Sequence, residues 1–257
     1  MTAQWDRLLP PLSHVENERS IVSVVVPAYR EGEYIKATLE GIAEAFRAAH
    51  LLSEIVVVLD SVQGDETASH VRDVSERYRE IRVIERRGKR GVGDAVTTGI
   101  QQARGWIVVI AMGDQSEHPS DVVRLARTAA YCDVVFTKRF KHGRPPGYPV
   151  LKYVANRCCN YAAMALFRMP YSDTTNAFKA YKKDVLDRLI FSSKGFEIFL
   201  EMPIKAMMIS RRTEEIEVDH VVKTKKAPKL SISRDAQRYI CVLLSLIRSS
   251  RRISSNP

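Results

Sequence analysis

The chain has 257 residues, of which 45% are hydrophobic and 27% are charged. This composition excludes a disordered or fibrous protein and is typical of one α/β domain with a single core. No apolar run approaches the roughly 20 residues that cross a bilayer, and the first residues lack the basic and apolar regions of a secretory signal. The four cysteines have neither metal-binding nor disulfide spacing, so we expect reduced thiols in a cytoplasmic protein.

Positive charge is concentrated at the end of the chain. Residues 221–257 contain nine Lys or Arg and one acidic residue, so this segment carries a net charge of +8 out of the +10 of the whole chain. A nucleic-acid-binding protein would spread its basic residues over the main domain, so we expect no nucleic-acid partner. The distribution predicts an N-terminal extension over residues 1–19, a main domain over 20–220, and a basic loop with a tail helix over 221–257.

Short β-branched runs alternate with helical patterns through the first half of the chain. They predict a mostly parallel sheet with helices on both faces. The expected strands span residues 21–26, 54–59, 81–85, 106–112 and 133–137, and the expected helices span residues 33–50, 65–78, 94–104 and 120–130.

The pattern changes after residue 137. Prolines and a glycine predict a loop over residues 145–149, and a helix rich in small and apolar residues follows over 151–167. A short extended segment near residues 175–181 leads to two further expected helices, over 195–208 and 233–249.

The residues after each strand are the candidates for chemistry, because α/β sheets bind ligands at the carboxyl ends of their strands. The first βα turn, PAYREGEY, lacks the glycines of a dinucleotide-binding loop, and GKRGVGDA is a weak phosphate-binding signal by itself. Three strands end in Glu31, Asp60 and Asp114. Helix capping explains one such acid, but gathered carboxylates repel one another unless a cation, or a sugar and base, lies between them.

Five blocks follow one another along the chain: SVVVPAYREGEYI, EIVVVLDSVQGDET, GKRGVGDAVTTGIQQARG, WIVVIAMGDQSEHPSD and SDTTNAFKAYKKDVLD. In their order and spacing they resemble the family 2 inverting glycosyltransferases with a GT-A fold, and above all their dolichol-phosphate mannosyltransferase and polyprenyl-phosphate sugar transferase branch. The resemblance implies inverting, metal-dependent transfer of a sugar from a nucleoside diphosphate sugar to a polyprenyl phosphate. The implied cofactor is Mg²⁺ or Mn²⁺, since hard cations prefer carboxylate and phosphate oxygens.

The resemblance also implies a set of donor-binding residues. Tyr29 would offer its ring to the base or ribose, Asp60 would bind the base, and Asp114 would hold the cation against the diphosphate. The implied nucleotide-sugar-binding residues are Pro27, Ala28, Tyr29, Glu31, Asp60, Arg87, Gly91, Gly93 and Asp114.

The implied cation site departs from the usual D-A-D motif of the branch. In MGDQSEHP, Gly113 and Gln115 stand at the two aspartate positions. A variant motif, A/G-D-x-S-D/E, fits this segment better, so we expect Asp114 and then Glu117 as metal ligands. Leu59 is a second departure, because the family often has an aspartate beside Asp60.

An ionised phosphate acceptor needs cations that hold and align it, and it needs no strong general base. The residues that the resemblance assigns to the acceptor phosphate are Arg139, Arg157, Lys223 and Lys229. Together with Asp173, which matches an acidic position near the reactive centre of the branch, the expected catalytic residues are Asp114, Arg157, Asp173 and Lys229. For a sugar hydroxyl as acceptor, the candidate general bases are Asp173, Glu197 and Glu201.

The tail helix is expected to be amphipathic. One face carries Arg234, Arg238, Cys241, Ser245, Arg248 and Arg252, and another carries Ile240, Leu243, Leu244 and Ile247. Such a helix can lie in a bilayer interface against anionic headgroups. We therefore expect peripheral association with the inner face of the membrane, with residues 151–167 as a second contact; packing on the same domain or on a second subunit is the alternative.

Three other functions compete with the leading one. The same fold could transfer a sugar to a hydroxyl on a small molecule or glycan, which keeps the donor site and changes the acceptor. A nucleotidyltransferase would instead release pyrophosphate. The incomplete D-A-D motif also leaves open a non-catalytic protein that binds nucleotide sugars.

Overall fold

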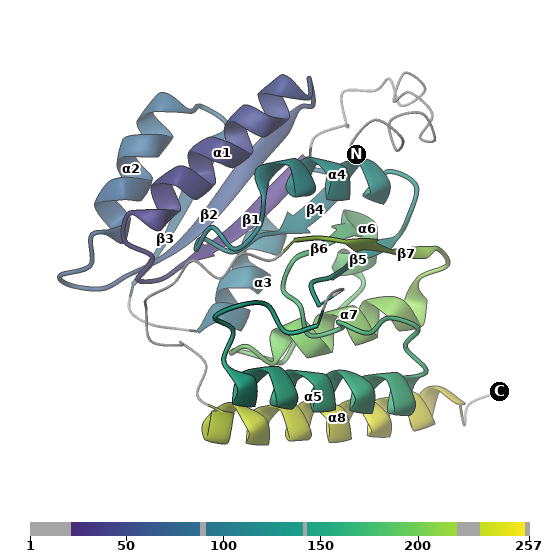
Figure 1. Ribbon diagram of the computed structural model, residues 1–257. Coiled ribbons are helices and arrows are strands. Elements are labelled where there is room, and N and C mark those ends of the chain that lie inside the picture. Colours follow the sequence, from purple (N-terminus) through teal and green to yellow (C-terminus); the bar gives the residue numbers. More distant parts are fainter. Residues whose placement is uncertain (1–21, 88–90, 141–142, 220–231, 255–257) are drawn as a thin grey trace.

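A computed structural model describes residues 22–87, 91–140, 143–219 and 232–254 (Figure 1). Their centre is a seven-stranded sheet in the order β3-β2-β1-β4-β6-β5-β7. Its strands are β1 (Val22–Ala28), β2 (Ser53–Ser61), β3 (Ile81–Arg87), β4 (Ile107–Ile110), β5 (Val134–Lys138), β6 (Lys179–Lys182) and β7 (Thr213–Glu217). Neighbouring strands are parallel except where β6 pairs with β4 and β5. The predicted mostly parallel α/β sheet is confirmed.

Helices cover both faces of the sheet, as predicted. One face carries α1 (Tyr34–Ala48), α2 (Thr67–Arg77) and α4 (Pro119–Ala129), and the other carries α3 (Val92–Gln102), α6 (Lys183–Asp187) and α7 (Ile198–Ile209). Below α7 lie α5 (Val150–Phe167) and α8 (Ile232–Ser254), side by side (Figure 1). Within the described ranges, no helix is long and apolar enough to cross a bilayer.

The sheet is buried on both faces, which explains its continuous apolar strands. Successive residues of a strand point to opposite faces. In β1, Val24 and Val26 belong to the core under α1, α2 and α4, whereas Val25 belongs to the core on the side of α3 and α7. The carboxyl ends of β1, β2 and β4 therefore meet along one edge, where the loops that follow them lie close together.

Several elements differ from the expectations. The fourth strand stops at Ile110 rather than at residue 112, and only Lys179–Lys182 of the expected extended segment forms a strand. The short α6 and the edge strand β7 were not expected. The sequence of β7, TEEIE, contains three glutamates because this strand pairs only with β5 and leaves most of its side chains partly or fully exposed.

Candidate active site

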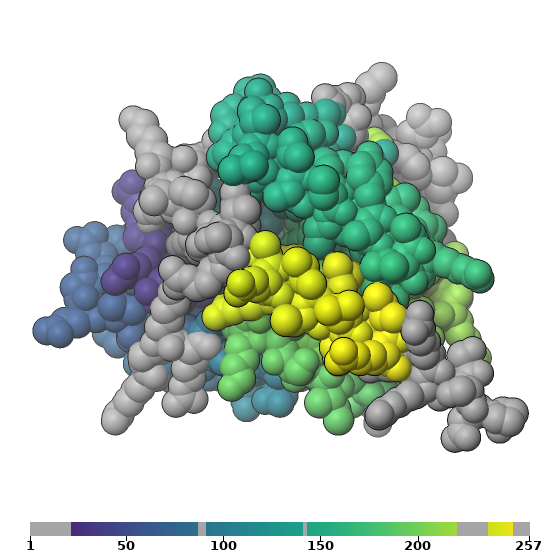
Figure 2. Space-filling model, turned by 90° about the horizontal axis from the view of Figure 1, so that it is seen from below, coloured from purple at the N-terminus to yellow at the C-terminus, as the bar shows by residue number. Residues whose placement is uncertain are grey.

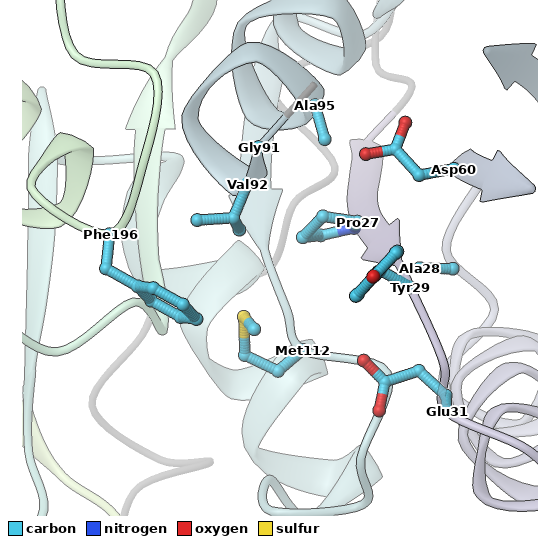
Figure 3. Close-up of a pocket in the computed structure, with 10 residues that line it drawn as sticks. All are labelled: Pro27, Ala28, Tyr29, Glu31, Asp60, Gly91, Val92, Ala95, Met112 and Phe196. Carbon is cyan, nitrogen blue, oxygen red and sulfur yellow. The ribbon is translucent and has the colours of Figure 1, made fainter. Parts of the chain in front are cut away.

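A cavity opens at the carboxyl ends of β1 and β2 (Figure 3). Its lining residues are Pro27, Ala28, Tyr29, Glu31, Asp60, Gly91, Val92, Ala95, Met112 and Phe196. Tyr29 and Phe196 lie on opposite sides, so two aromatic rings flank the opening, and Asp60 and Glu31 bring carboxylates to the side of Tyr29 (Figure 3). Aromatic rings beside a few polar groups are typical of a site for a small organic ligand.

Asp60 does not stand alone in this cavity. It lies opposite Arg86 in the register of β2 and β3, and both are buried. The guanidinium donates two parallel hydrogen bonds to the carboxylate, from Nε to Oδ1 and from Nη2 to Oδ2, each 2.7 Å long. Nη2 also donates to the carbonyl of Gly91 at 3.2 Å. Arg86 therefore fixes both the carboxylate and the start of α3.

The turn that carries Glu31 is held by the segment before α2. The backbone N–H groups of Glu31 and Gly32 donate to Oγ1 of Thr67 at 2.8 and 2.9 Å. Thr67 in turn donates to Asp65 at 2.9 Å. These bonds join the loop after β1 to the loop after β2. They fix the backbone at Glu31 and do not involve its carboxylate, which is buried.

The loop after β4 carries Asp114 and packs directly on Glu31. A Cβ at Gly113 would lie 3.1 Å from Cγ of Glu31 and 2.7 Å from Cδ1 of Ile35, so only glycine allows this approach. Oδ1 of Asp114 accepts from the N–H of Ser116 at 3.1 Å. The loop ends where His118 caps α4 and Pro119 takes its first turn.

Glu117 lies in the electrostatic field of Asp114. Burial and the negative charge of Asp114 raise the pKa of the Glu117 carboxyl to about 8. Two adjacent carboxylates that favour a proton also favour a divalent cation, which relieves the same repulsion. Among the described residues, no group of three His, Cys, Asp or Glu side chains could hold a metal. By their chemistry, Asp114 and Glu117 are thus a pair of carboxylates that suits a divalent cation.

A second buried ion pair joins the end of β5 to the loop before β6. Asp173 is 1% exposed and accepts from Arg139 through Nε at 2.9 Å, Nη2 at 2.8 Å and the backbone N–H at 3.0 Å. Arg139 lowers the pKa of Asp173 below its ordinary value although burial opposes this shift. A carboxylate held in this way is a poor proton acceptor at neutral pH.

The Arg139 pair and the Asp114 loop belong to one cluster of charges. Arg139 counteracts the rise in the Glu117 pKa, and it also helps burial to lower the pKa of Lys152 on α5. Asp114 acts on Lys152 in the opposite sense. Cationic and anionic groups at the β4 loop, the end of β5 and α5 are therefore close enough to shift one another's pKa values.

The segment 192–197 closes the cavity on the side of Phe196. A Cβ at Gly91 would lie 2.3 Å from the carbonyl oxygen of Lys194, and Gly93 donates its N–H to the same oxygen at 2.9 Å. The hydroxyl of Tyr239 on α8 donates to the carbonyl of Phe196 at 2.9 Å. Gly91 and Gly93 of the third sequence block thus allow this segment to pack closely on the start of α3. Gly91 lines the cavity, whereas Gly93 does not.

Two carboxylates of the α7 region hold the same segment from beneath. Glu201 accepts from the N–H groups of Ser192 and Ser193 and from Lys205. Glu197 is buried and accepts from the N–H of Gly195 at 3.0 Å. Both glutamates, considered above as bases for a hydroxyl acceptor, thus support the wall of the cavity.

The structure brings most of the predicted donor residues together. Pro27, Ala28, Tyr29, Glu31, Asp60 and Gly91 line one cavity, and the loop that contains Asp114 packs on Glu31. The predicted residues Lys223 and Lys229 lie outside the described residues, and so does the side chain of Arg87.

Arg157 lies on α5 near the second ion pair. It donates to the carbonyl of Ser172 and to the hydroxyl of Tyr161, both at 2.9 Å. Its partner Ser172 directly precedes Asp173 in the chain, so Arg157 is bound to the segment that holds Arg139.

Sequence reasoning missed Arg86, Val92, Ala95, Met112 and Phe196. A signal existed for Arg86 alone. The parallel register that pairs β2 with β3 places Asp60 opposite it.

Residues 23–190, more than half of the chain, match the family described as Glycosyl transferase family 2. A dolichol-phosphate mannosyltransferase of Pyrococcus furiosus is 26% identical over 72% of this chain and 52% of its own length. An undecaprenyl-phosphate mannosyltransferase of Micrococcus luteus is 23% identical, with 82% of this chain and 87% of that protein covered. The chain therefore spans about half of the first relative and most of the second.

Solved structures share the fold at lower identity. Glucosyl-3-phosphoglycerate synthase from Mycobacterium tuberculosis, in complex with Mn²⁺, UDP-glucose and phosphoglyceric acid, is 16% identical with a TM-score of 0.67, and 90% of this chain and 80% of that chain are covered. The same enzyme with Mg²⁺ and UDP has a TM-score of 0.65 at 16% identity, with 89% and 79% covered. These likenesses establish the GT-A fold.

Proposed function

Because the chain belongs to glycosyl transferase family 2, we propose that it transfers a sugar from a nucleoside diphosphate sugar to a polyprenyl phosphate at a membrane surface. The observation that carries this proposal is the cluster between the β4 loop and α5. There the carboxylates of Asp114 and Glu117 lie within the electrostatic influence of Arg139, which is held by Asp173. Such a cluster can bring a cation-bound donor next to an anionic acceptor.

The donor would occupy the cavity of Figure 3. Tyr29 and Phe196 offer apolar area to the base and ribose, and Asp60 offers a carboxylate that Arg86 orients through two hydrogen bonds. Glu31 lies between this region and the Asp114 loop. The diphosphate of such a donor would then extend toward Asp114 and Glu117.

Asp114 and Glu117 would hold the divalent cation. When bound, Mg²⁺ or Mn²⁺ neutralises the charge that develops on the departing nucleoside diphosphate. Within this chain, Asp114 and Glu117 orient the diphosphate, and Arg139 and Lys152 add positive charge on the side of the acceptor. A single in-line displacement inverts the anomeric carbon.

The acceptor side favours a phosphate over a hydroxyl. A hydroxyl needs a base, and the three candidates Asp173, Glu197 and Glu201 each hold other groups of the protein. A phosphate needs cations, which Arg139 and Arg157 would supply. The two arginines bind neighbouring residues, Asp173 and Ser172. We propose that Lys223 and Lys229 join them in the full chain, and that the protein binds the inner face of the membrane peripherally.

A second candidate keeps the donor site and changes the acceptor. The M. tuberculosis structure contains phosphoglyceric acid, an anionic small molecule that also carries a hydroxyl. Incubation with a labelled nucleotide sugar separates the two candidates. Label in an organic-soluble product supports the lipid acceptor, and label that stays in the aqueous phase supports the small molecule.

Substitution of Asp114 by Ala tests the central assignment. We expect transfer to a short, soluble prenyl phosphate to fall by roughly 100-fold or more, because the charge of the leaving group is no longer neutralised. Asp187→Ala, at an exposed position on α6, is the matched control and should keep full activity. Unchanged turnover and unchanged metal dependence in Asp114→Ala would overturn the assignment.

A further inference from the structure

The outer face of α5 carries an unburied apolar stripe. Leu151, Val154 and Tyr161 are 66%, 49% and 56% exposed, and Cys158 and Ala165 are also exposed. These five positions are spaced by three, four, three and four residues, which places them along one side of a helix. Leu166, at 51% exposed, widens the stripe at its end. A soluble surface rarely leaves a continuous row of large apolar side chains in water.

The neighbouring helix α8 presents less apolar surface than its sequence suggests. Leu246 is buried, and Tyr239, Val242 and Leu243 pack on the core that also contains Leu200 of α7. Of the four residues of the predicted apolar face, Ile240 and Leu244 remain 56% and 50% exposed, whereas Leu243 and Ile247 are half-buried. The helix therefore packs on its own domain, and Ile240 and Leu244 still contribute apolar atoms to the surface. Figure 2 shows α8 at this surface beside α5.

Among the side chains of α5 and α8 that the structure describes, every charged one is basic. The sequence of α5 contains no Asp or Glu, and Arg168 follows it in an exposed position. On α8, Arg238 and Arg248 are exposed. Basic residues next to exposed apolar ones match the interface of a bilayer with anionic lipids, where the headgroups attract the cations and the apolar side chains enter the acyl boundary.

We infer that α5 and α8 together form the surface by which the protein docks on an anionic lipid bilayer, and that the α5 stripe supplies the main apolar contact. A second copy of the chain is a poorer occupant. In a twofold dimer this patch would meet the same patch of a second copy, so Arg168, Arg238 and Arg248 would face a surface whose described charges are also basic.

This docking surface rests on the proposed function and adds to it the place where the protein would meet the membrane. Arg157 reaches from α5 to Ser172, next to the Asp173 that holds Arg139. A lipid phosphate could therefore keep its hydrocarbon in the bilayer under α5 while its headgroup reaches Arg139. The arrangement explains why a helix without acidic residues lies next to the cationic side of the cluster.

Co-sedimentation of the full chain with vesicles tests the inference. We expect binding to vesicles of phosphatidylcholine with one third phosphatidylglycerol, weak binding to pure phosphatidylcholine, and loss of binding at high salt. The double variant Val154→Glu/Leu166→Glu should bind the anionic vesicles at least tenfold less, since it adds negative charge to the stripe. Leu52→Glu is the control, because Leu52 is 69% exposed and lies between α1 and β2, away from this face.

The outcomes separate docking from catalysis. The double variant should keep its melting temperature and its transfer to a short, soluble prenyl phosphate, because its side chains lie outside the cavity and the cluster. Unchanged vesicle binding in the double variant would overturn the docking surface. So would a wild-type chain that transfers the sugar to the soluble prenyl phosphate but does not sediment with anionic vesicles. A change from dimer to monomer without any vesicle binding would assign the stripe to a second copy. Vesicle binding without any transfer would leave the docking surface standing and remove the proposed function.

Discussion

Two buried Arg–Asp pairs lie at the opposite sides of the candidate active site, and they present opposite charges. In the donor-side pair, Asp60 lines the cavity and Arg86 braces it from the next strand. In the acceptor-side pair, Asp173 is 1% exposed and Arg139 is 12% exposed, so the guanidinium is the outer member. On the proposed function, the same bidentate geometry would thus offer a carboxylate to the donor and a cation to the acceptor.

On the proposed function, the member of each ion pair that meets the ligand, rather than the pair itself, would decide what the site binds. A lone buried charge is costly, and a bidentate partner offsets much of that cost while it fixes the orientation of the outer group. A nucleoside base offers N–H donors that suit a carboxylate, whereas a phosphate suits a guanidinium. Each pair can be broken separately.

The largest effect is expected for Arg139→Gln. It leaves the carboxylate of Asp173 buried without its partner, which should lower the free energy of unfolding by about 3–5 kcal/mol. Turnover should also fall roughly 100- to 1,000-fold, because the acceptor loses its cation. Urea unfolding and initial rates with a short prenyl phosphate measure both quantities.

Arg139→Lys is the matched variant for this test. Its ammonium keeps the charge but not the planar fork, so we expect most of the stability to return and the acceptor KM to stay high. A large change in donor KM with a normal acceptor KM would contradict the assignment of this pair to the acceptor.

Arg86→Lys should change the KM for the donor rather than the KM for the acceptor. The ammonium cannot make both 2.7 Å bonds to Asp60 and also reach Gly91 in the same way. We expect the donor KM to rise about tenfold, since hydrogen bonds between charged groups contribute about 1.5–3 kcal/mol. The acceptor KM should not change, and equal shifts in both constants would show that the two pairs are not separate in function.

Lys179, beside the acceptor-side pair, provides a pH test. Burial lowers the pKa of this amine to about 7, whereas in an unfolded chain it titrates near ~10.4. Between these values the unfolded state binds more protons, so the contribution of Lys179 to the free energy of unfolding increases as pH rises from about 7 to about 10. Lys179→Met should remove this slope and stabilise the protein by about 1–2 kcal/mol near pH 7. Unfolding curves at several pH values test this, and an unaltered slope in the variant would refute it.

The smallest effect is expected for Tyr239→Phe. This variant removes the hydrogen bond from α8 to the carbonyl of Phe196 and leaves the ring in place. We expect a loss of about 1 kcal/mol in the free energy of unfolding and a several-fold rise in donor KM. Tyr131→Phe, at a partly exposed position after α4, is the control. A rise in acceptor KM alone would show that α8 supports the other side of the site.

Much of the fold could be read from the sequence because the first strands are buried on both faces. Their uninterrupted β-branched runs are unlike any helix pattern, and the acids that end them were predicted to share one edge. Glu31 and Asp60 do line one cavity. The edge strand β7 has no such signal, since TEEIE pairs on one side and is otherwise open to water.

The parts of the site that sequence could not supply depend on contacts between distant segments. Phe196 reaches the cavity from a segment more than 160 residues beyond Tyr29, and nothing local to it indicates a ligand. Asp173 was expected near the reactive centre, but its role as the brace of Arg139 follows only from their packing. For the tail helix, an amphipathic pattern could not say which apolar residues pack inward, and Leu246 proved to be the buried one.

The crossing of residues 193–195 over α3 limits where negative charge can be neutralised. The first amides of a helix are a common seat for phosphate groups, yet the N–H of Gly93 and, at 3.4 Å, that of Asp94 already point to the carbonyl oxygen of Lys194. The positive end of the α3 dipole is therefore partly satisfied from within the protein. On the proposed function, a diphosphate at this end of the sheet would therefore depend on a bound divalent cation, and the supply of that ion in the surrounding solution would control the rate.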